Sequence, residues 1–171
     1  MRPPLPAGIT DLSYAGSVRW ENSKGADIYR RGMYIWFQRT IAFPQLMAFD
    51  CPDSNVTAIR RNRSNSPLQA LTLLNDPAFV ECAQSLAKRT LSSAPAEPAA
   101  RIQYAYKNCL ARPAGDDEVK LLSDLVTKQQ DFYADKPDLA AKIAGAAKDA
   151  TPNPAEAAAY AVMARTVMNL D

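Results

Sequence analysis

The stretch SPLQALTLLNDPAFV, residues 66–80, contains two helix starts in direct succession. In each start, a residue whose side chain can cap a helix precedes a proline: Ser66 before Pro67, and Asp76 before Pro77. The capping oxygen accepts a backbone N–H of the first turn. Proline suits the first helical position because its missing N–H would have no partner there. The stretch therefore predicts a short helix from Pro67 and a second helix from Pro77.

Similar signals continue to the end of the chain. Apolar residues recur at helical spacing after Pro98 and after Pro154, which follows Asn153 as a cap. Asp116 is the expected cap of another helix, whose acidic first turn suits the positive end of the helix dipole. The predicted helices span 67–75, 77–92, 98–111, 116–132, 138–149 and 154–170. In the last helix we expect four side chains to face inward: Tyr160, Met163, Val167 and Leu170.

The N-terminal third of the chain has a different pattern. Aromatic and β-branched side chains alternate over residues 32–39, which favours a strand. This strand could pair with residues 17–21 as a hairpin, and a helix over 28–41 is the competing interpretation. One helical turn is expected at 44–49, followed by an irregular loop.

These patterns predict a mainly α fold, an irregular helical array preceded by an extended or β-hairpin segment. We divide it into a segment with an Arg-rich loop, 1–66, and a helical region, 67–171, which together form one domain. With 171 residues, of which 47% are hydrophobic, the chain can bury a substantial core. The sequence ends on an apolar helix without a capping glycine, so we expect it to be part of a longer polypeptide.

Composition excludes several kinds of site. The chain has no histidine, so it cannot hold a Ser–His or Cys–His pair, a zinc site with histidine ligands, or a C-x-x-C-H haem attachment. Its three cysteines, Cys51, Cys82 and Cys109, are far apart in sequence and are expected to be small buried side chains. We therefore predict no metal site and no cofactor in this chain. No run of 18 apolar residues occurs, so we expect no membrane span.

The most distinctive polar cluster precedes the helix start at Pro67. It offers three guanidinium groups with amide and hydroxyl donors, a combination that can hold a sulfate, phosphate or carboxylate: Arg60, Arg61, Asn62, Arg63, Ser64 and Asn65. The alternative is structural, with the arginines paired to nearby acids such as Asp50, Asp53 or Asp76. Nucleic acid is disfavoured as a partner, because so short a cluster contacts few phosphates.

Two weaker candidates lie in the same half of the chain. Trp36 and its aromatic neighbours, with arginines among them, could stack on a sugar ring, although a strand with one face in the core explains them as well. Asp50 and Asp53 flank Cys51-Pro52 and could act as an acid–base pair. The same residues are typical of a turn, so the catalytic role is the weaker interpretation.

Four phrases of the sequence carry a resemblance: RRGMYIWFQRT at 30–40, FDCPDSNV at 49–56, RRNRSNSPLQALTLLNDP at 60–77, and CLARPAGDDEV at 109–119. They closely resemble the PSD-type domain of unknown function of large planctomycete proteins that also carry a cytochrome c domain. The resemblance implies an exported, extracytoplasmic parent protein with haem c bound upstream. It transfers no catalytic residues.

These observations suggest two functions for the chain. The first is an accessory or interaction module of a larger haem-containing protein, which binds an anionic ligand or an upstream domain of the same polypeptide. The second is a component of an enzyme acting on a polysaccharide or sulfated glycan, with the site completed by upstream domains. The arginines distinguish the two, since catalysis needs them in a partly dry pocket beside a carboxylate.

Overall fold

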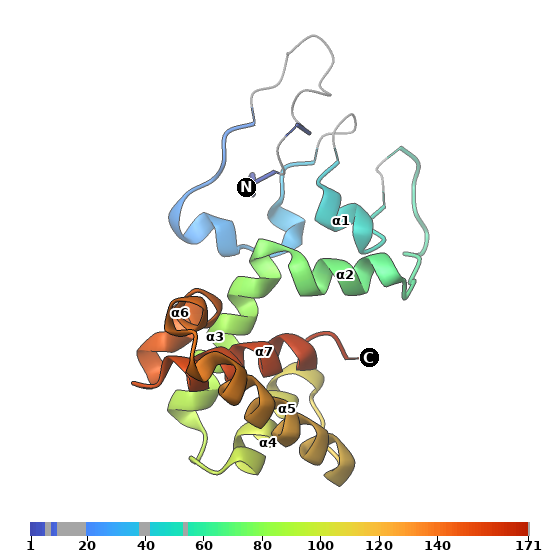
Figure 1. Ribbon diagram of the computed structural model, residues 1–171. Helices are drawn as coiled ribbons and strands as arrows, with labels where there is room; N and C mark the ends of the chain where they lie inside the picture. The colour runs from blue at the N-terminus through green and yellow to red at the C-terminus, as the bar shows by residue number, and fades with distance from the viewer. Residues whose placement is uncertain (6–7, 10–19, 38–41, 53–54, 171) are drawn as a thin grey trace. The chain divides into compact units, whose positions relative to one another are not determined.

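The computed structural model describes the whole chain except residues 6–7, 10–19, 38–41, 53–54 and 171. The chain divides into two compact units, Met1–Gln69 and Ala70–Asp171, which we call the N-terminal and C-terminal units. The described residues contain helices and no strand, so the fold is mainly α as predicted (Figure 1).

The C-terminal unit is a helical array built around its last helix. Its α-helices are α3 (Pro77–Ser93), α4 (Pro98–Leu110), α5 (Asp116–Ala134), α6 (Pro137–Ala144) and α7 (Pro154–Val167), with the 3-10 helix η5 (Gly145–Ala150) before α7. Helix α7 packs against α3, α5, α6 and η5. Most of α7 is buried, through Ala157, Ala158, Ala159, Tyr160, Ala161, Met163, Ala164 and Val167. The small alanine side chains let neighbouring helices approach closely.

Helix α2 (Pro67–Asn75) crosses the boundary between the units, and its start follows the predicted signal. Ser66 Oγ accepts the backbone N–H of Gln69 at 3.3 Å, and Gln69 Oε1 accepts the backbone N–H of Ser66 at 3.0 Å. This reciprocal pair is a capping box. The predicted caps of α3 and α7 are also confirmed, since Asp76 accepts from Ala78 N and Asn153 accepts from Ala155 N.

The predicted N-terminal β-hairpin is wrong. Residues 25–29 form the 3-10 helix η3 (Gly25–Tyr29), and η4 (Gly32–Tyr34) lies within the predicted strand; residues 17–19 and 38–39 of the hairpin lie outside the described residues. Described residues in and beside the predicted strands bond to the first residues of the chain. Trp36 N donates to Met1 O at 2.7 Å, and Ser23 N donates to Arg2 O at 2.8 Å.

Other corrections are local. The cap of α5 is Gly115 and not Asp116, because Glu118 reaches back and accepts the Gly115 N–H at 2.8 Å. The prediction that the three cysteines are buried is wrong. Cys82 and Cys109 are exposed on the outer faces of α3 and α4, and Cys51 is half-buried. The single turn expected at 44–49 is confirmed as α1 (Pro44–Ala48).

Candidate anion-binding loop

The Arg-rich cluster lies in the loop between α1 and α2, within the N-terminal unit. The loop leaves α1 through Asp50, whose backbone is left-handed with φ = 57°. Among residues other than glycine, asparagine and aspartate adopt this conformation most readily. The turn is fixed further by Cys51 N, which donates to Leu46 O at 2.9 Å. It directs the chain into the segment that carries the arginines.

The Asp50 carboxylate joins the two ends of this loop. Its Oδ2 atom accepts the backbone N–H and the hydroxyl of Ser64, each at 2.7 Å, and the Gln69 amide at 3.4 Å. The Gln69 amide also donates to Ser64 Oγ at 3.0 Å. The bonds from the Ser64 hydroxyl and backbone, with the Gln69 amide and the Arg61 charge, hold the pKa of Asp50 below its usual value. Asp50 is therefore a fixed anion rather than a group that exchanges protons near neutral pH.

Arg61 also contacts the start of the loop, just after α1. Its Nε donates to Asp50 O at 3.2 Å, and its Nη2 donates to Phe49 O. Both acceptors are backbone carbonyls just after α1. Arg61 therefore has the structural role that the sequence left open, although its partners are carbonyl groups rather than a carboxylate.

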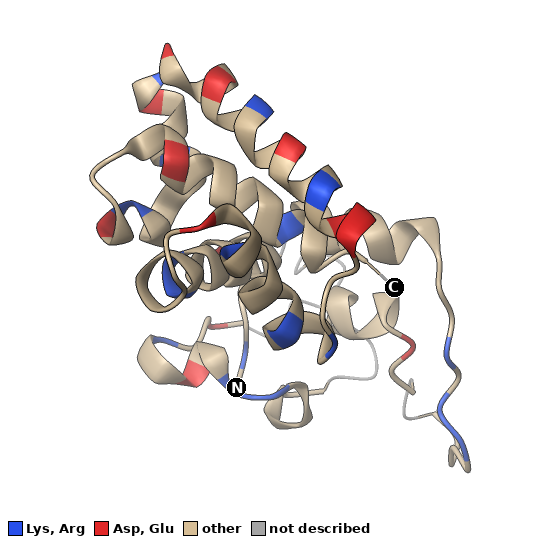
Figure 2. Ribbon diagram, turned by 90° about the horizontal axis from the view of Figure 1, so that it is seen from below, with Lys and Arg blue, Asp and Glu red and all other residues tan. Residues whose placement is uncertain are grey.

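Arg60 and Arg63 are in a different position. Both are exposed, and within the part of the chain that the structure describes their side chains have no hydrogen bond or ion pair. Asn62 is exposed beside them, and Asn65 is exposed but has an interaction of its own. Figure 2 colours the Lys and Arg residues of the chain blue and the Asp and Glu residues red. The cluster thus contains one arginine committed to the fold and two available to a ligand.

Trp36 does not join the loop. The guanidinium carbon of Arg2 lies 4.2 Å from the Trp36 ring centroid, and the Trp20 ring lies 5.8 Å away at an angle of 46°. Trp20 in turn donates from Nε1 to Pro3 O at 2.7 Å. Arg2 covers one face of Trp36, so that face is not a free platform for a sugar.

The acid–base pair suggested by the sequence gains no support. Asp50 is committed to the loop contacts, and Asp53 lies outside the described residues. No group of three or more metal-binding side chains occurs among the residues described. The helices that the structure describes include none long and apolar enough to cross a membrane.

Sequence reasoning missed Gln69, which is buried and joins the helix cap to the Asp50 contacts. A signal for it existed, because Ser66 and Gln69 have the spacing of a capping box. No comparable signal connects Asp50 to Ser64 across 14 residues. Their contact depends on the path of the whole loop.

Comparison with known proteins gives one match. The profile of the PSD1 family, described as "Protein of unknown function (DUF1553)", matches residues 2–126. The matched range includes the whole candidate loop and ends within α5. No curated protein and no solved structure matches the chain.

Proposed function

The chain belongs to the PSD1 family of proteins of unknown function (DUF1553), and from this premise we propose that it is an interaction module whose loop binds an anionic group through Arg60 and Arg63. The proposal rests on the different contacts that the three arginines make. Arg61 is spent on backbone carbonyls, whereas Arg60 and Arg63 are exposed on a loop whose two ends are tied together. Tying the loop reduces the entropy lost when a ligand binds.

The chemistry of the loop defines the ligand class. A guanidinium recognises planar or tetrahedral oxyanions through paired N–H donors. Sulfate, phosphate and carboxylate groups meet this description, whether on a small molecule, a glycan or a partner domain. The sequence from 55 to 65 contains no acidic residue. The nearby Asp50 carboxylate is already occupied by hydrogen bonds from Ser64 and Gln69.

The setting of this module is part of the proposal and rests on the sequence resemblance. We place the chain in a larger exported planctomycete protein, outside the cytoplasm, in which an upstream domain holds haem c. Upstream domains of the same polypeptide would then be the nearest partners. The absence of histidine agrees with a haem held outside this chain.

An enzyme component acting on polysaccharide or sulfated glycan is less well supported. It would use the Arg cluster with Asp50 or Asp53 as an acid or base. The Asp50 carboxylate accepts three hydrogen bonds, and these contacts hold its pKa low. Asp53 lies outside the described residues. It would also use Trp36 for stacking, and Arg2 covers one face of that ring.

The proposal is tested by sulfate titration of the full chain, followed by NMR of the loop amides and of the arginine Nε–H groups. We expect millimolar sulfate to shift signals of residues 55–65, and the double variant Arg60→Ala/Arg63→Ala to lose the shifts. Thermal unfolding run in parallel should show stabilisation of about 1.4 kcal/mol at tenfold excess over Kd, provided that the loop opens in the unfolding transition.

Two single variants separate binding from folding. Arg89→Ala removes an exposed arginine of α3 and should leave the sulfate response intact. Arg61→Ala should loosen the loop even without sulfate, because it removes both carbonyl contacts. An unchanged sulfate response in the Arg60/Arg63 double variant would refute the proposed site.

A further inference from the structure

The C-terminal unit contains a hollow of about 490 Å³ along one face of α4. Residues at helical spacing form its floor: Ala100, Gln103, Tyr104, Lys107 and Ala111. The end of α3 with Ser93–Pro95 lines one side, and Arg112–Pro113 lines another. We call this feature the α4 groove. Its volume lies within the range of small-molecule sites.

Hydrogen bonds fix the polar residues at one end of the α4 groove. The Gln103 amide bonds to Ala114 through both of its ends, with Nε2 donating to Ala114 O at 2.8 Å and Oε1 accepting from Ala114 N at 2.9 Å. Arg112 forms a two-pronged pair with Glu118, both contacts at 2.8 Å. The connection between α4 and α5 is therefore held in place without a ligand, so a ligand would meet a preformed surface.

The charges at the α4 groove do not balance. Arg112 is neutralised by Glu118, whose pKa is lowered to about 2 chiefly by that pair. Lys107 is exposed and has no ion pair among the described residues. The remaining lining is largely aliphatic or aromatic, from Ala94, Pro95, Ala100 and Tyr104. The groove thus presents an apolar surface beside one uncompensated positive charge.

We propose that the α4 groove binds a small organic anion, a carboxylate with an aromatic or short aliphatic body. The body would lie on Ala100, Pro95 and the Tyr104 ring, and the carboxylate would pair with the Lys107 ammonium. Tyr104 and Lys107 are three residues apart on α4, so their side chains are neighbours on the helix surface. This site is independent of the anion-binding loop, which lies in the other unit.

Lys107 has a second role that the test must separate. It lies in the last turn of α4, where a positive charge is favourable for the helix dipole. That role predicts a change in stability when the charge is lost, but no difference between charged and neutral ligands.

The test uses the full chain with two probes that share one body, 4-phenylbutyrate and the neutral 4-phenylbutan-1-ol, each titrated to 10 mM with NMR detection. We expect both to shift signals from residues 93–113, and the acid to bind up to about fivefold more tightly, the size of an exposed ion pair. Lys107→Met keeps the aliphatic stem and should bring the affinity for the acid down to that for the alcohol.

Matched variants complete the design. Lys128→Met removes an exposed lysine of α5 outside the groove and should preserve the preference for the acid. Ala100→Trp fills the floor and should weaken both probes. Absence of shifts in 93–113 with either probe, equal affinity for acid and alcohol in the wild type, or an undiminished preference in Lys107→Met would each overturn the proposal. Since the readout residues differ from 55–65, this outcome is distinguishable from failure of the anion-binding loop.

Discussion

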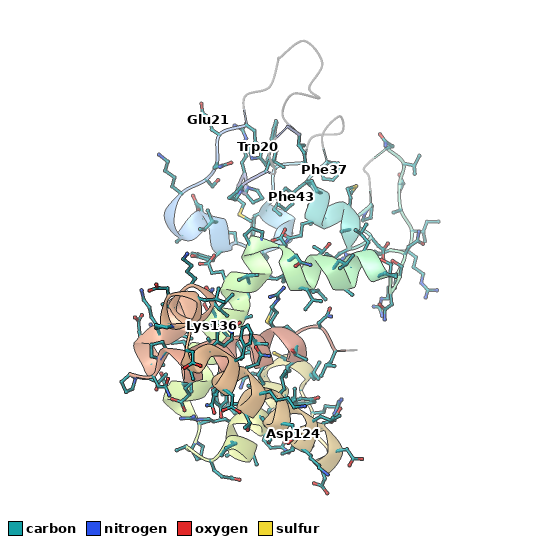
Figure 3. All side chains as sticks on the ribbon, viewed as in Figure 1. Trp20, Glu21, Phe37, Phe43, Asp124 and Lys136 are labelled. Carbon is teal, nitrogen blue, oxygen red and sulfur yellow. The ribbon has the colours of Figure 1, made fainter. Side chains whose placement is uncertain are left out.

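The C-terminal unit surrounds a continuous apolar core, whereas the described part of the N-terminal unit depends mainly on polar contacts. The core of the C-terminal unit includes Ile102, Tyr160, Met163 and Val167, all almost completely buried. Among the described residues of the N-terminal unit, Phe43, labelled in Figure 3, is the large apolar side chain with comparable burial. That unit relies instead on contacts such as those of Asp50 and Arg61.

The two units are therefore expected to differ in the free energy needed to open them. Burial of a large apolar side chain stabilises by roughly 1.5–3 kcal/mol, while an intramolecular hydrogen bond contributes about 1 kcal/mol net. Segments with few buried contacts and exposed hydrogen bonds open at lower free energy than a core. We therefore expect the N-terminal unit to open locally while the C-terminal unit stays folded.

The largest effect is expected from Met163→Ala, which would remove a fully buried side chain at the centre of the C-terminal unit. The free energy of unfolding should fall by about 2–5 kcal/mol, the usual range for such a truncation in a core. Urea denaturation followed by far-UV circular dichroism measures it. The control Leu121→Ala truncates an exposed leucine of α5 and should change the value by less than about 0.5 kcal/mol. Similar losses in both variants would contradict a core centred on α7.

A smaller, pH-dependent effect tests the contacts of Glu118 with Arg112 and Gly115 in the same unit, which we call the polar lock. The Arg112 pair and the Gly115 N–H lower the pKa of Glu118 from 4.5 to about 2. Because the folded-state pKa lies below the unfolded value, the stabilisation is complete above about pH 4.5 and is lost as the pH falls toward 2. Thermal unfolding of Glu118→Gln should therefore depend less on pH between 5 and 2 than wild type does.

The control for the pH experiment is Asp124→Asn on the same helix, labelled in Figure 3. Asp124 is exposed and has no ion pair among the described residues. Its pH profile should follow that of wild type. If Glu118→Gln kept the full acid dependence, the Arg112–Glu118 pair would not contribute to the lock.

The smallest effect on global stability is expected from Ser64→Ala in the N-terminal unit. The change removes the hydroxyl that donates to Asp50 and accepts from Gln69. Trypsin cleavage after the loop arginines should accelerate by about fivefold, the equivalent of one lost hydrogen bond. The free energy of global unfolding should stay within about 0.5 kcal/mol of wild type.

Ser85→Ala on α3, an exposed serine, is the matched control and should alter neither measurement. If Ser64→Ala lowered global stability as much as Met163→Ala, the two units would unfold as one. The comparison between them would then fail.

The sequence predicted what depends on neighbouring residues. The helix starts after Ser66, Asp76 and Asn153 are confirmed, because a cap and its N–H partner lie within three residues of each other. The inward positions Tyr160, Met163 and Val167 are also confirmed, since helical spacing alone places them on one side. Leu170 was wrongly placed inward, because it lies beyond Val167, where α7 ends.

Features that depend on distant partners could not be predicted. The alternation around Met33 and Tyr34 indicated a strand, yet the first residues of the chain supply the hydrogen bonds that a hairpin partner would have made. Asp50 and Arg61 were identified as candidates, but their roles follow from a closed loop that no local pattern reveals. Charge and residue type identified the Arg-rich cluster as a candidate site. Only the contacts in the structure distinguish the structural Arg61 from Arg60 and Arg63, which are available to a ligand.

The central position of α7 has a consequence for biosynthesis. A ribosome releases α3, α4 and α5 before α7, so their apolar faces emerge without the helix that later covers them. At typical rates of synthesis, the interval from Ser93 to Val167 lasts roughly 4–15 s. During that time the apolar faces of α3, α4 and α5 are open to aggregation. A chaperone that shields them would increase the yield of folded protein.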